Sequence, residues 1–167
     1  SNDILLMSDG KAQYNCIINH NGGVIDDSIV YKFGSKNYMI VVNASNIDKD
    51  WNWINEQNKK FNNKLTNISD STSLLALQGP KANEVIQKLV DFDLSQFKSY
   101  SFVKNDIAEI KEVIISTTGY TGSGGVELYV NNNDAVALYS LLIKTGEYLG
   151  IKPIGLAARD TLRLEMG

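Results

Sequence analysis

The 167-residue sequence has few of the side chains that form cross-links or metal sites. Its single cysteine, Cys16, excludes an internal disulfide and any Cys-x-x-Cys redox or zinc site. Its single histidine, His20, excludes a metal site built on two histidines and leaves only one candidate for a Ser-His-Asp triad. We therefore expect no metal centre and a protein from a reducing compartment.

The sequence also lacks a strong charge excess and long apolar runs. Its net charge of −3, from 16 basic and 19 acidic residues, argues against an electropositive nucleic-acid binder. No apolar run approaches the roughly 20 residues that span a bilayer, and residues 1–7 do not have the basic start of a signal peptide. We expect a cytoplasmic protein without nucleic-acid or membrane partners. Residues 1–2 are interpreted as a cloning remnant, and residues 3–167 as one domain.

Arginine is scarce, because lysine makes up all but two of the 16 basic residues. The two arginines, Arg159 and Arg163, lie one helical turn apart near the end of the sequence. In a chain that otherwise uses lysine, an arginine indicates a need for a planar, bidentate donor. The alternative is an ordinary helix surface, with Asp160 and Glu165 as ion-pair partners.

The hydrophobic pattern predicts an α+β fold with antiparallel sheets and packed helices. The Asn21-Gly22 pair between two strand-like runs predicts a hairpin. A hairpin precedes each of the helices expected at 46–62 and 133–149, which suggests an internal, pseudo-duplicated arrangement. Strands are expected at 11–19, 24–33, 38–43, 72–77, 100–103, 113–117 and 126–130, and further helices after Gly79-Pro80 and over 155–166.

The first expected helix, 46–62, shows a helical apolar period. Ser45 or Asn46 is expected to cap its first turn. Its apolar face is predicted to consist of Ile47, Trp51, Ile54 and Phe61.

Asp27 is the most informative single residue. Side chains alternate between the two faces of a strand, so Asp27 shares a face with Ile25 and Ile29, whereas Asp26 lies on the opposite face. A buried carboxylate costs free energy unless it is paired, which makes Asp27 a candidate for a raised pKa and a catalytic role. Asp26 is expected to be solvated. The alternative is that Asp27 is an acid near a turn that reaches solvent or caps a loop.

A glycine-rich segment, 118–125, precedes the strand that carries Glu127. Glycines let the backbone approach a ligand closely. The segment is not a phosphate loop, because a strand follows it and it contains no Gly-Lys-Ser/Thr. On this pattern alone a flexible hairpin loop is the favoured interpretation, and the periodicity leaves the orientation of Glu127 open.

Seven segments stand out in order along the sequence: DGKAQY (9–14), GGVIDDSIVY (22–31), VVNASN (41–46), LQGPKA (77–82), TGYTG (118–122), GVE (125–127) and GLAARDTLRLE (155–165). Taken together and in this order, they resemble the aminomethyltransferases, the T proteins of the glycine cleavage system. One departure is Ser123-Gly124, where the family usually carries Glu-Asp. Family members also extend beyond both ends of the sequence and include a barrel-like C-terminal domain, so the sequence corresponds to a fragment, the folate-binding core.

The resemblance implies a tetrahydrofolate-dependent enzyme. Such an enzyme cleaves the aminomethyl group from the lipoyl arm of the H protein, releases ammonia and forms 5,10-methylenetetrahydrofolate. Tetrahydrofolate is then a co-substrate and the H protein a partner. Asp27 matches the catalytic aspartate of the family. The positions that match residues near the folate are Tyr14, Asn43, Tyr120, Glu127 and Arg159.

Two alternatives share the folate site. One is a folate module of a demethylase or of a sarcosine or dimethylglycine dehydrogenase, which is usually fused to flavin domains. The other is a non-catalytic folate-binding protein that assists iron–sulfur assembly. Relatives of that kind centre on a Lys-Gly-Cys-type motif, and nothing similar surrounds Cys16.

Overall fold

The computed structural model describes residues 2–166. The chain divides into two compact units, Ser1–Asp70 and Ser71–Gly167, which are described one at a time. Both combine antiparallel strands with helices, which confirms the predicted α+β class. Within the described residues, no helix has both the length and the apolar composition that a membrane span requires.

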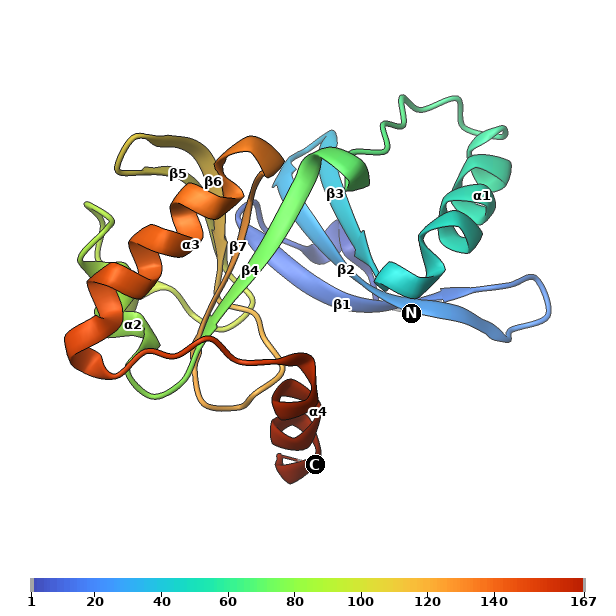
Figure 1. Ribbon diagram of the computed structural model, residues 1–167. Coiled ribbons are helices and arrows are strands. Elements are labelled where there is room, and N and C mark those ends of the chain that lie inside the picture. Colours follow the sequence, from blue (N-terminus) through green and yellow to red (C-terminus); the bar gives the residue numbers. More distant parts are fainter. Residues whose placement is uncertain (1, 167) are drawn as a thin grey trace. The chain divides into compact units, whose positions relative to one another are not determined.

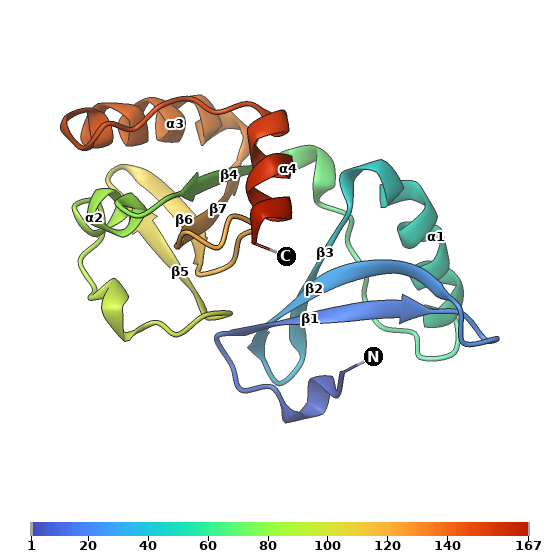
Figure 2. The same cartoon turned by 90° about the horizontal axis from the view of Figure 1, so that it is seen from below.

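The first unit contains a three-stranded antiparallel sheet in the order β1-β2-β3, followed by one α-helix (Figures 1 and 2). The Asn-Gly hairpin is confirmed: the Asn19 N–H donates to the Gly23 carbonyl (2.8 Å), and Gly22 has a φ of 82°, which favours glycine. The elements are β1 (Lys11–Ile18), β2 (Val24–Gly34), β3 (Asn37–Val42) and α1 (Ile47–Asn58).

Helix α1 departs from its predicted pattern at both ends. It ends at Asn58, so Phe61 lies beyond it and is 71% exposed. The side chain of Asn46 makes no capping hydrogen bond at the N-terminus of the helix. The one fully buried residue of α1 is an acid, Asp50, which lies three residues after Ile47 and therefore on the face that was predicted to be apolar.

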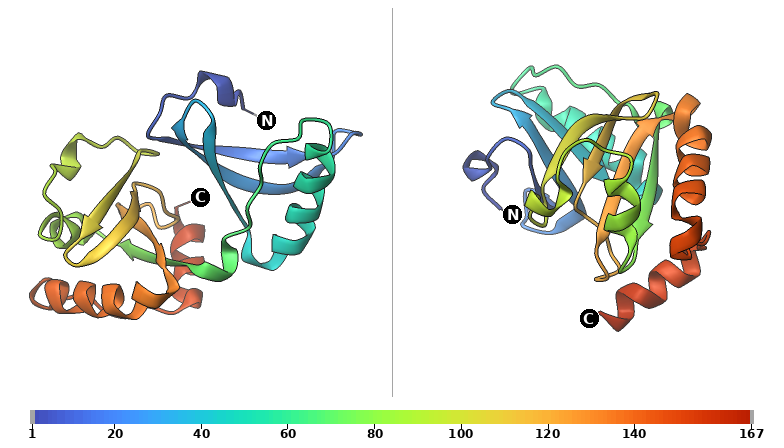
Figure 3. Two further views of the ribbon diagram at one scale, coloured as in Figure 1. Left: turned by 90° about the horizontal axis from the view of Figure 1, so that it is seen from above. Right: turned by 90° about the vertical axis from the view of Figure 1, so that its left-hand side faces the viewer.

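The second unit contains a four-stranded antiparallel sheet in the order β4-β7-β6-β5. Helix α3 runs along one face of this sheet (Figures 1 and 3). The elements are β4 (Thr72–Gln78), α2 (Ala82–Gln87), β5 (Phe102–Ile107), β6 (Ile110–Ser116), β7 (Gly125–Asn131), α3 (Asn132–Gly146) and α4 (Leu156–Glu165). Short 3₁₀ turns lie at Ile4–Leu6, Ala44–Asn46, Ser69–Ser71, Leu94–Gln96 and Glu147–Leu149.

The hydrophobic core of the second unit lies between the sheet and helices α2 and α3. Val126, Leu128 and Val130 of β7 point into it, and Leu138 of α3 is fully buried there. Because strand side chains alternate, Glu127 projects from the opposite face of the sheet. The core therefore fixes β7 in a register that presents Glu127 away from the helices.

The two units share an order of elements. In each, a three-stranded antiparallel meander is followed by an α-helix: β1-β2-β3-α1 in the first and β5-β6-β7-α3 in the second. The second unit adds β4 beside β7. The hairpin that precedes each of these helices in the sequence therefore reflects a local topology that occurs twice.

Candidate functional site

The two aspartates of β2 lie opposite to the sequence-based expectation. Asp26 is buried, with 9% of its surface exposed, together with Ser28 and Val30 on the same strand face. Asp27 is only half-buried. The expected alternation is present, but the prediction that Asp26 is the solvated acid is wrong.

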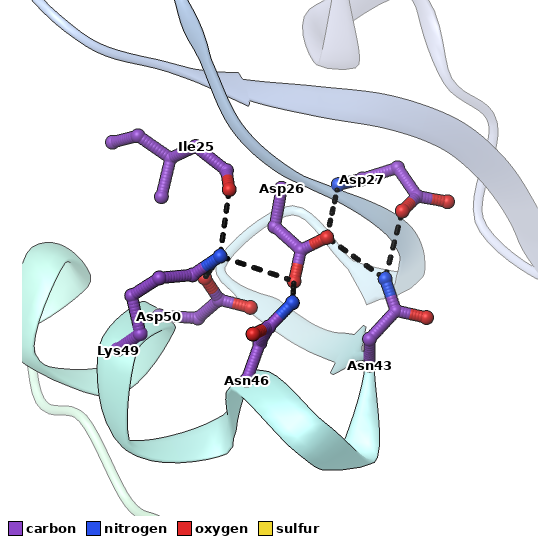
Figure 4. A network of polar contacts seen from close by, with 7 residues as sticks. All are labelled: Ile25, Asp26, Asp27, Asn43, Asn46, Lys49 and Asp50. Atoms are coloured by element: carbon purple, nitrogen blue, oxygen red, sulfur yellow. Dashed lines mark hydrogen bonds and ion pairs between the residues drawn. The ribbon is translucent and has the colours of Figure 1, made fainter.

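Three hydrogen bonds offset the cost of burying Asp26 (Figure 4). Its Oδ1 accepts from the backbone N–H of Asp27 (2.9 Å) and from Nδ2 of Asn43 (2.9 Å). Its Oδ2 accepts from Nδ2 of Asn46 (2.7 Å), and the Lys49 ammonium lies 3.9 Å from the same oxygen. Asn46 therefore supports a carboxylate instead of capping α1.

The hydrogen bonds decide the charge state of Asp26. Burial by itself would raise the pKa of Asp26, but the bonds from Asn43, Asn46 and the Asp27 N–H stabilise the ionised form and lower the pKa to about 2. Asp26 is therefore a carboxylate at neutral pH, and its negative charge is stabilised by hydrogen bonds within the first unit.

This lowered pKa predicts a loss of stability in acid. The stabilisation is complete above the unfolded-state pKa of 3.8 and is lost as the pH falls through the folded-state pKa of about 2. At about 1.4 kcal/mol per pKa unit, the loss is about 2.5 kcal/mol. It can be followed by fluorescence, since both tryptophans, Trp51 and Trp53, lie in α1 and report on the first unit.

The control for this prediction is Asp26→Asn, which removes the titrating group at similar volume. Denaturant unfolding between about pH 2 and about pH 5 is expected to show an acid-side slope in the wild-type chain that is reduced in the variant. Equal slopes in the two proteins would show that Asp26 does not carry the effect.

The structure brings Asp27 and Asn43 together. Nδ2 of Asn43 donates to Oδ1 of Asp27 over 2.7 Å. The strand register explains this contact: Ile29 pairs with Val41, so the positions two residues further along, Asp27 and Asn43, face each other on the same side of the sheet. Among the described residues, Asp27 Oδ2 accepts no hydrogen bond, and this oxygen is open to a ligand.

Tyr14 projects from the same face of the first sheet. It pairs with Ile29 across the β1–β2 ladder, and the neighbouring pair is Cys16 with Asp27. Directly opposite residues of antiparallel strands share a face, so Tyr14 and Asp27 are diagonal neighbours. Tyr14 is 46% exposed. This face thus presents an aromatic ring, a carboxylate and an amide.

Glu127 is the central acid of the second unit. It is 5% exposed, and its Oε2 accepts a hydrogen bond from the Thr118 hydroxyl, which lies 3.0 Å from the Ser116 hydroxyl. Burial raises the pKa of Glu127, although the Thr118 bond and the charge of Arg159 act in the opposite direction. Its Oε1 accepts no hydrogen bond from the described residues.

The β4–β7 ladder, in which Glu127 pairs with Ala76, contains a close backbone approach. Two residues before Glu127, Gly125 has a φ of 119°, and a Cβ at this position would lie 2.2 Å from the carbonyl oxygen of Leu77. Only glycine fits such a contact. The glycine-rich segment is therefore required by the fold at this position.

Arg159 stacks on Tyr120. Its guanidinium carbon lies 4.2 Å from the centroid of the Tyr120 ring, a cation–π geometry, and its Nη1 lies 3.5 Å from Asp160 Oδ1. The predicted pairing with Asp160 is thus confirmed, while the planar guanidinium also covers an aromatic face, as lysine could not do equally well. The positive charge of Arg159 also acts to lower the pKa of Glu127, against the effect of burial.

The sequence-predicted residues therefore form two groups. Tyr14, Asp27 and Asn43 lie in the first unit, and Tyr120, Glu127 and Arg159 lie in the second. No set of three metal-ligating side chains gathers within residues 2–166.

Four polar residues around these groups were missed as site residues: Asp26, Asn46, Asp50 and Thr118. Each had a signal in the sequence. Thr118 opens the glycine-rich segment, and Asn46 follows Ser45 as the second candidate for the cap of α1. Asp50 occupies an apolar-face position of its helix, and Asp26 shares a strand face with Val24 and Val30.

Asp27 is half-buried and Glu127 is buried, and each accepts a hydrogen bond from the described residues through only one carboxyl oxygen. Such acids on an α+β scaffold are typical of a ligand-binding or catalytic protein. The whole sequence, residues 1–167, matches the family described as GCVT N-terminal domain. The chain therefore belongs to the GCVT N-terminal domain family.

Similar proteins support this assignment. An aminomethyltransferase of Flavobacterium psychrophilum is 55% identical over 167 residues, which are 100% of this chain and 46% of that protein. One of Phocaeicola vulgatus is 50% identical over the same shares. The crystal structure of the glycine cleavage system aminomethyltransferase T from Bartonella henselae matches with a TM-score of 0.79 and 28% identity, over 96% of this chain and 42% of that one. The chain thus spans about half the length of the curated relatives it matches.

Proposed function

We propose that this chain is part of a tetrahydrofolate-dependent aminomethyltransferase of the glycine cleavage system. The reaction would take the aminomethyl group from the lipoyl arm of the H protein, release ammonia and yield 5,10-methylenetetrahydrofolate. The observation that carries the proposal is the Asp27–Asn43 pair, in which one carboxylate oxygen is held at 2.7 Å and the other is left open. The aminomethyltransferase names of similar proteins supply the reaction class.

Asp27 is proposed as the catalytic residue. The departure of ammonia leaves an electron-poor, iminium-like carbon, and a fixed carboxylate beside it would stabilise that positive charge. The same carboxylate would manage a proton during the transfer. Asn43 suits this role because its amide fixes the Asp27 carboxylate without neutralising its charge.

The residues of the second unit are proposed to bind the folate. The pterin ring presents an amino group and a ring N–H side by side, which a carboxylate can accept together. Glu127 fits this chemistry: it is nearly buried, is oriented by Thr118, and keeps Oε1 for a ligand. Arg159 is proposed either to bind a ligand carboxylate or to act on Glu127 through its charge. Tyr14 and Tyr120 offer exposed aromatic rings.

The test is an ammonia-release assay on the full-length protein, with aminomethylated H protein and tetrahydrofolate. Release that requires both substrates supports the proposal. Activity on sarcosine or dimethylglycine instead would favour a demethylase or dehydrogenase module. Folate binding without ammonia release would favour a non-catalytic folate-binding protein.

A further inference from the structure

Asp50 is a buried acid to which the proposed reaction assigns no role. It is 0% exposed, and neither of its carboxyl oxygens accepts a hydrogen bond from the described residues. An ionised carboxylate in such a position would keep its full desolvation penalty. A structural acid is normally paired, so the missing donors need an explanation.

The charges around Asp50 do not provide a dedicated partner. The titratable groups that face it are Asp26 and Asp27 of β2 and Lys49 of its own helix. Nζ of Lys49 is 4.0 Å from Asp50 Oδ1, but it donates to the carbonyl of Ile25 at 2.7 Å (Figure 4). Lys49 is also 47% exposed and lies 3.9 Å from Asp26. One partly solvated ammonium therefore faces two acids, Asp26 and Asp50.

A proton on Asp50 resolves this imbalance. A carboxylic acid can donate a hydrogen bond, and the carboxylate of Asp26 lies within hydrogen-bonding reach. The pair then carries one negative charge instead of two, which suits the single nearby ammonium. Consistent with this geometry, burial first and the Asp26 carboxylate second raise the pKa of Asp50 to about 6.

The arrangement continues from Asp26 to the proposed catalytic acid. One amide nitrogen of Asn43 donates to both Asp26 and Asp27, at 2.9 Å and 2.7 Å. The reversed amide would point its carbonyl oxygen at two carboxylate oxygens, so the orientation of Asn43 depends on Asp26 staying in place. A movement of Asp26 would therefore shift the Asn43 amide and, through it, the Asp27 carboxylate.

We propose that Asp50 is a positioning residue that stays protonated, donates a hydrogen bond to Asp26 in a buried acid–carboxylate pair, and so holds Asn43 and Asp27 in their functional orientation. Ionisation of Asp50 places two negative charges in one buried contact and loosens the arrangement. The acid–carboxylate pair is independent of the proposed function, whereas the consequence for turnover rests on it.

The first test detects the proton on Asp50 without any activity assay. Asp50 binds a proton more tightly in the folded chain, so its contribution to stability is complete below its unfolded-state pKa of 3.8 and is lost as the pH rises through about 6. Unfolding followed by tryptophan fluorescence is expected to show this loss as about a 10²-fold rise in the unfolding constant between about pH 4 and about pH 7. Asp50→Asn, whose amide stays neutral and still donates to Asp26, is expected to lose this rise.

The matched control is Asp48→Asn, which neutralises an exposed acid in the same helical turn. It is expected to keep the wild-type pH dependence. Should Asp50→Asn retain the full rise, or Asp48→Asn remove it, Asp50 would not carry the proton and the proposal would be overturned.

The second test follows the positioning of Asn43. Its side-chain N–H₂ signal in a two-dimensional NMR spectrum, assigned by its absence in Asn43→Ser, is expected to titrate with a midpoint near the pKa of Asp50, about 6. In Asp50→Asn the signal is expected to stay constant over that range. A wild-type signal that does not move would overturn the link from Asp50 to Asn43.

Turnover of the full-length protein supplies the last test. The ratio of kcat for Asp50→Asn to kcat for the wild type is expected to rise with pH around 6, since only the wild type loses the proton. A ratio independent of pH would overturn the positioning role. Complete absence of ammonia release in the wild type would refute the proposed function, while the unfolding and NMR tests would still decide on the acid–carboxylate pair.

Discussion

Asp27→Asn in the full-length protein is expected to keep folate binding and to lose most of its turnover. Asparagine has nearly the same size, and its carbonyl oxygen can still accept the bond from Asn43, so the local structure should survive. It cannot take up a proton or place a full negative charge beside the electron-poor carbon. Loss of a positioned acid–base group lowers rates by about 10²–10⁴-fold, which corresponds to roughly 3–5 kcal/mol.

Steady-state ammonia release and tetrahydrofolate binding would be measured side by side. Asp48→Asn is the matched control, because Asp48 is an exposed acid of the same unit. Asp26→Asn does not serve as a control, because Asp26 anchors Asn43 and its loss should disturb Asp27 indirectly. The catalytic assignment of Asp27 fails if its variant turns over at a rate close to that of Asp48→Asn.

Glu127→Ala in the full-length protein is expected to weaken tetrahydrofolate binding much more than it slows the chemical step. The carboxylate would bind the pterin donors equally in the ground state and in the transition state, and such uniform binding affects affinity without changing kcat. Hydrogen bonds to charged groups contribute about 1.5–3 kcal/mol, so the dissociation constant should rise by roughly 10–150-fold.

The comparison requires folate titration and turnover at saturating folate. Glu109→Ala, at an exposed acid between β5 and β6 of the same unit, is the control and should change neither quantity. A large fall in turnover at saturating folate, with folate affinity unchanged, would show that Glu127 acts in the chemical step and not in folate binding. Folding of the variant should be checked by near-UV circular dichroism, because Glu127 is almost buried.

The sequence alone determined the local elements of this protein. Strand and helix periods depend on neighbouring residues, so the β1–β2 hairpin and the helix after Gly79-Pro80, which is α2, could be predicted. Alternation also showed correctly that Asp26 and Asp27 lie on opposite faces of β2. The motif resemblance pointed to the family, which the match over residues 1–167 confirmed.

Only the tertiary structure decided which of these acids is buried. Period-two alternation states which residues share a face, but the packing of distant segments decides which face is covered. Asp26 is buried because Asn43 and Asn46, 17 and 20 residues away in the sequence, supply its donors. Asp50, an acid at an apolar-face position of α1, is buried near the same carboxylate. The chemistry of this site thus depends on hydrogen bonds between segments that no local pattern could pair.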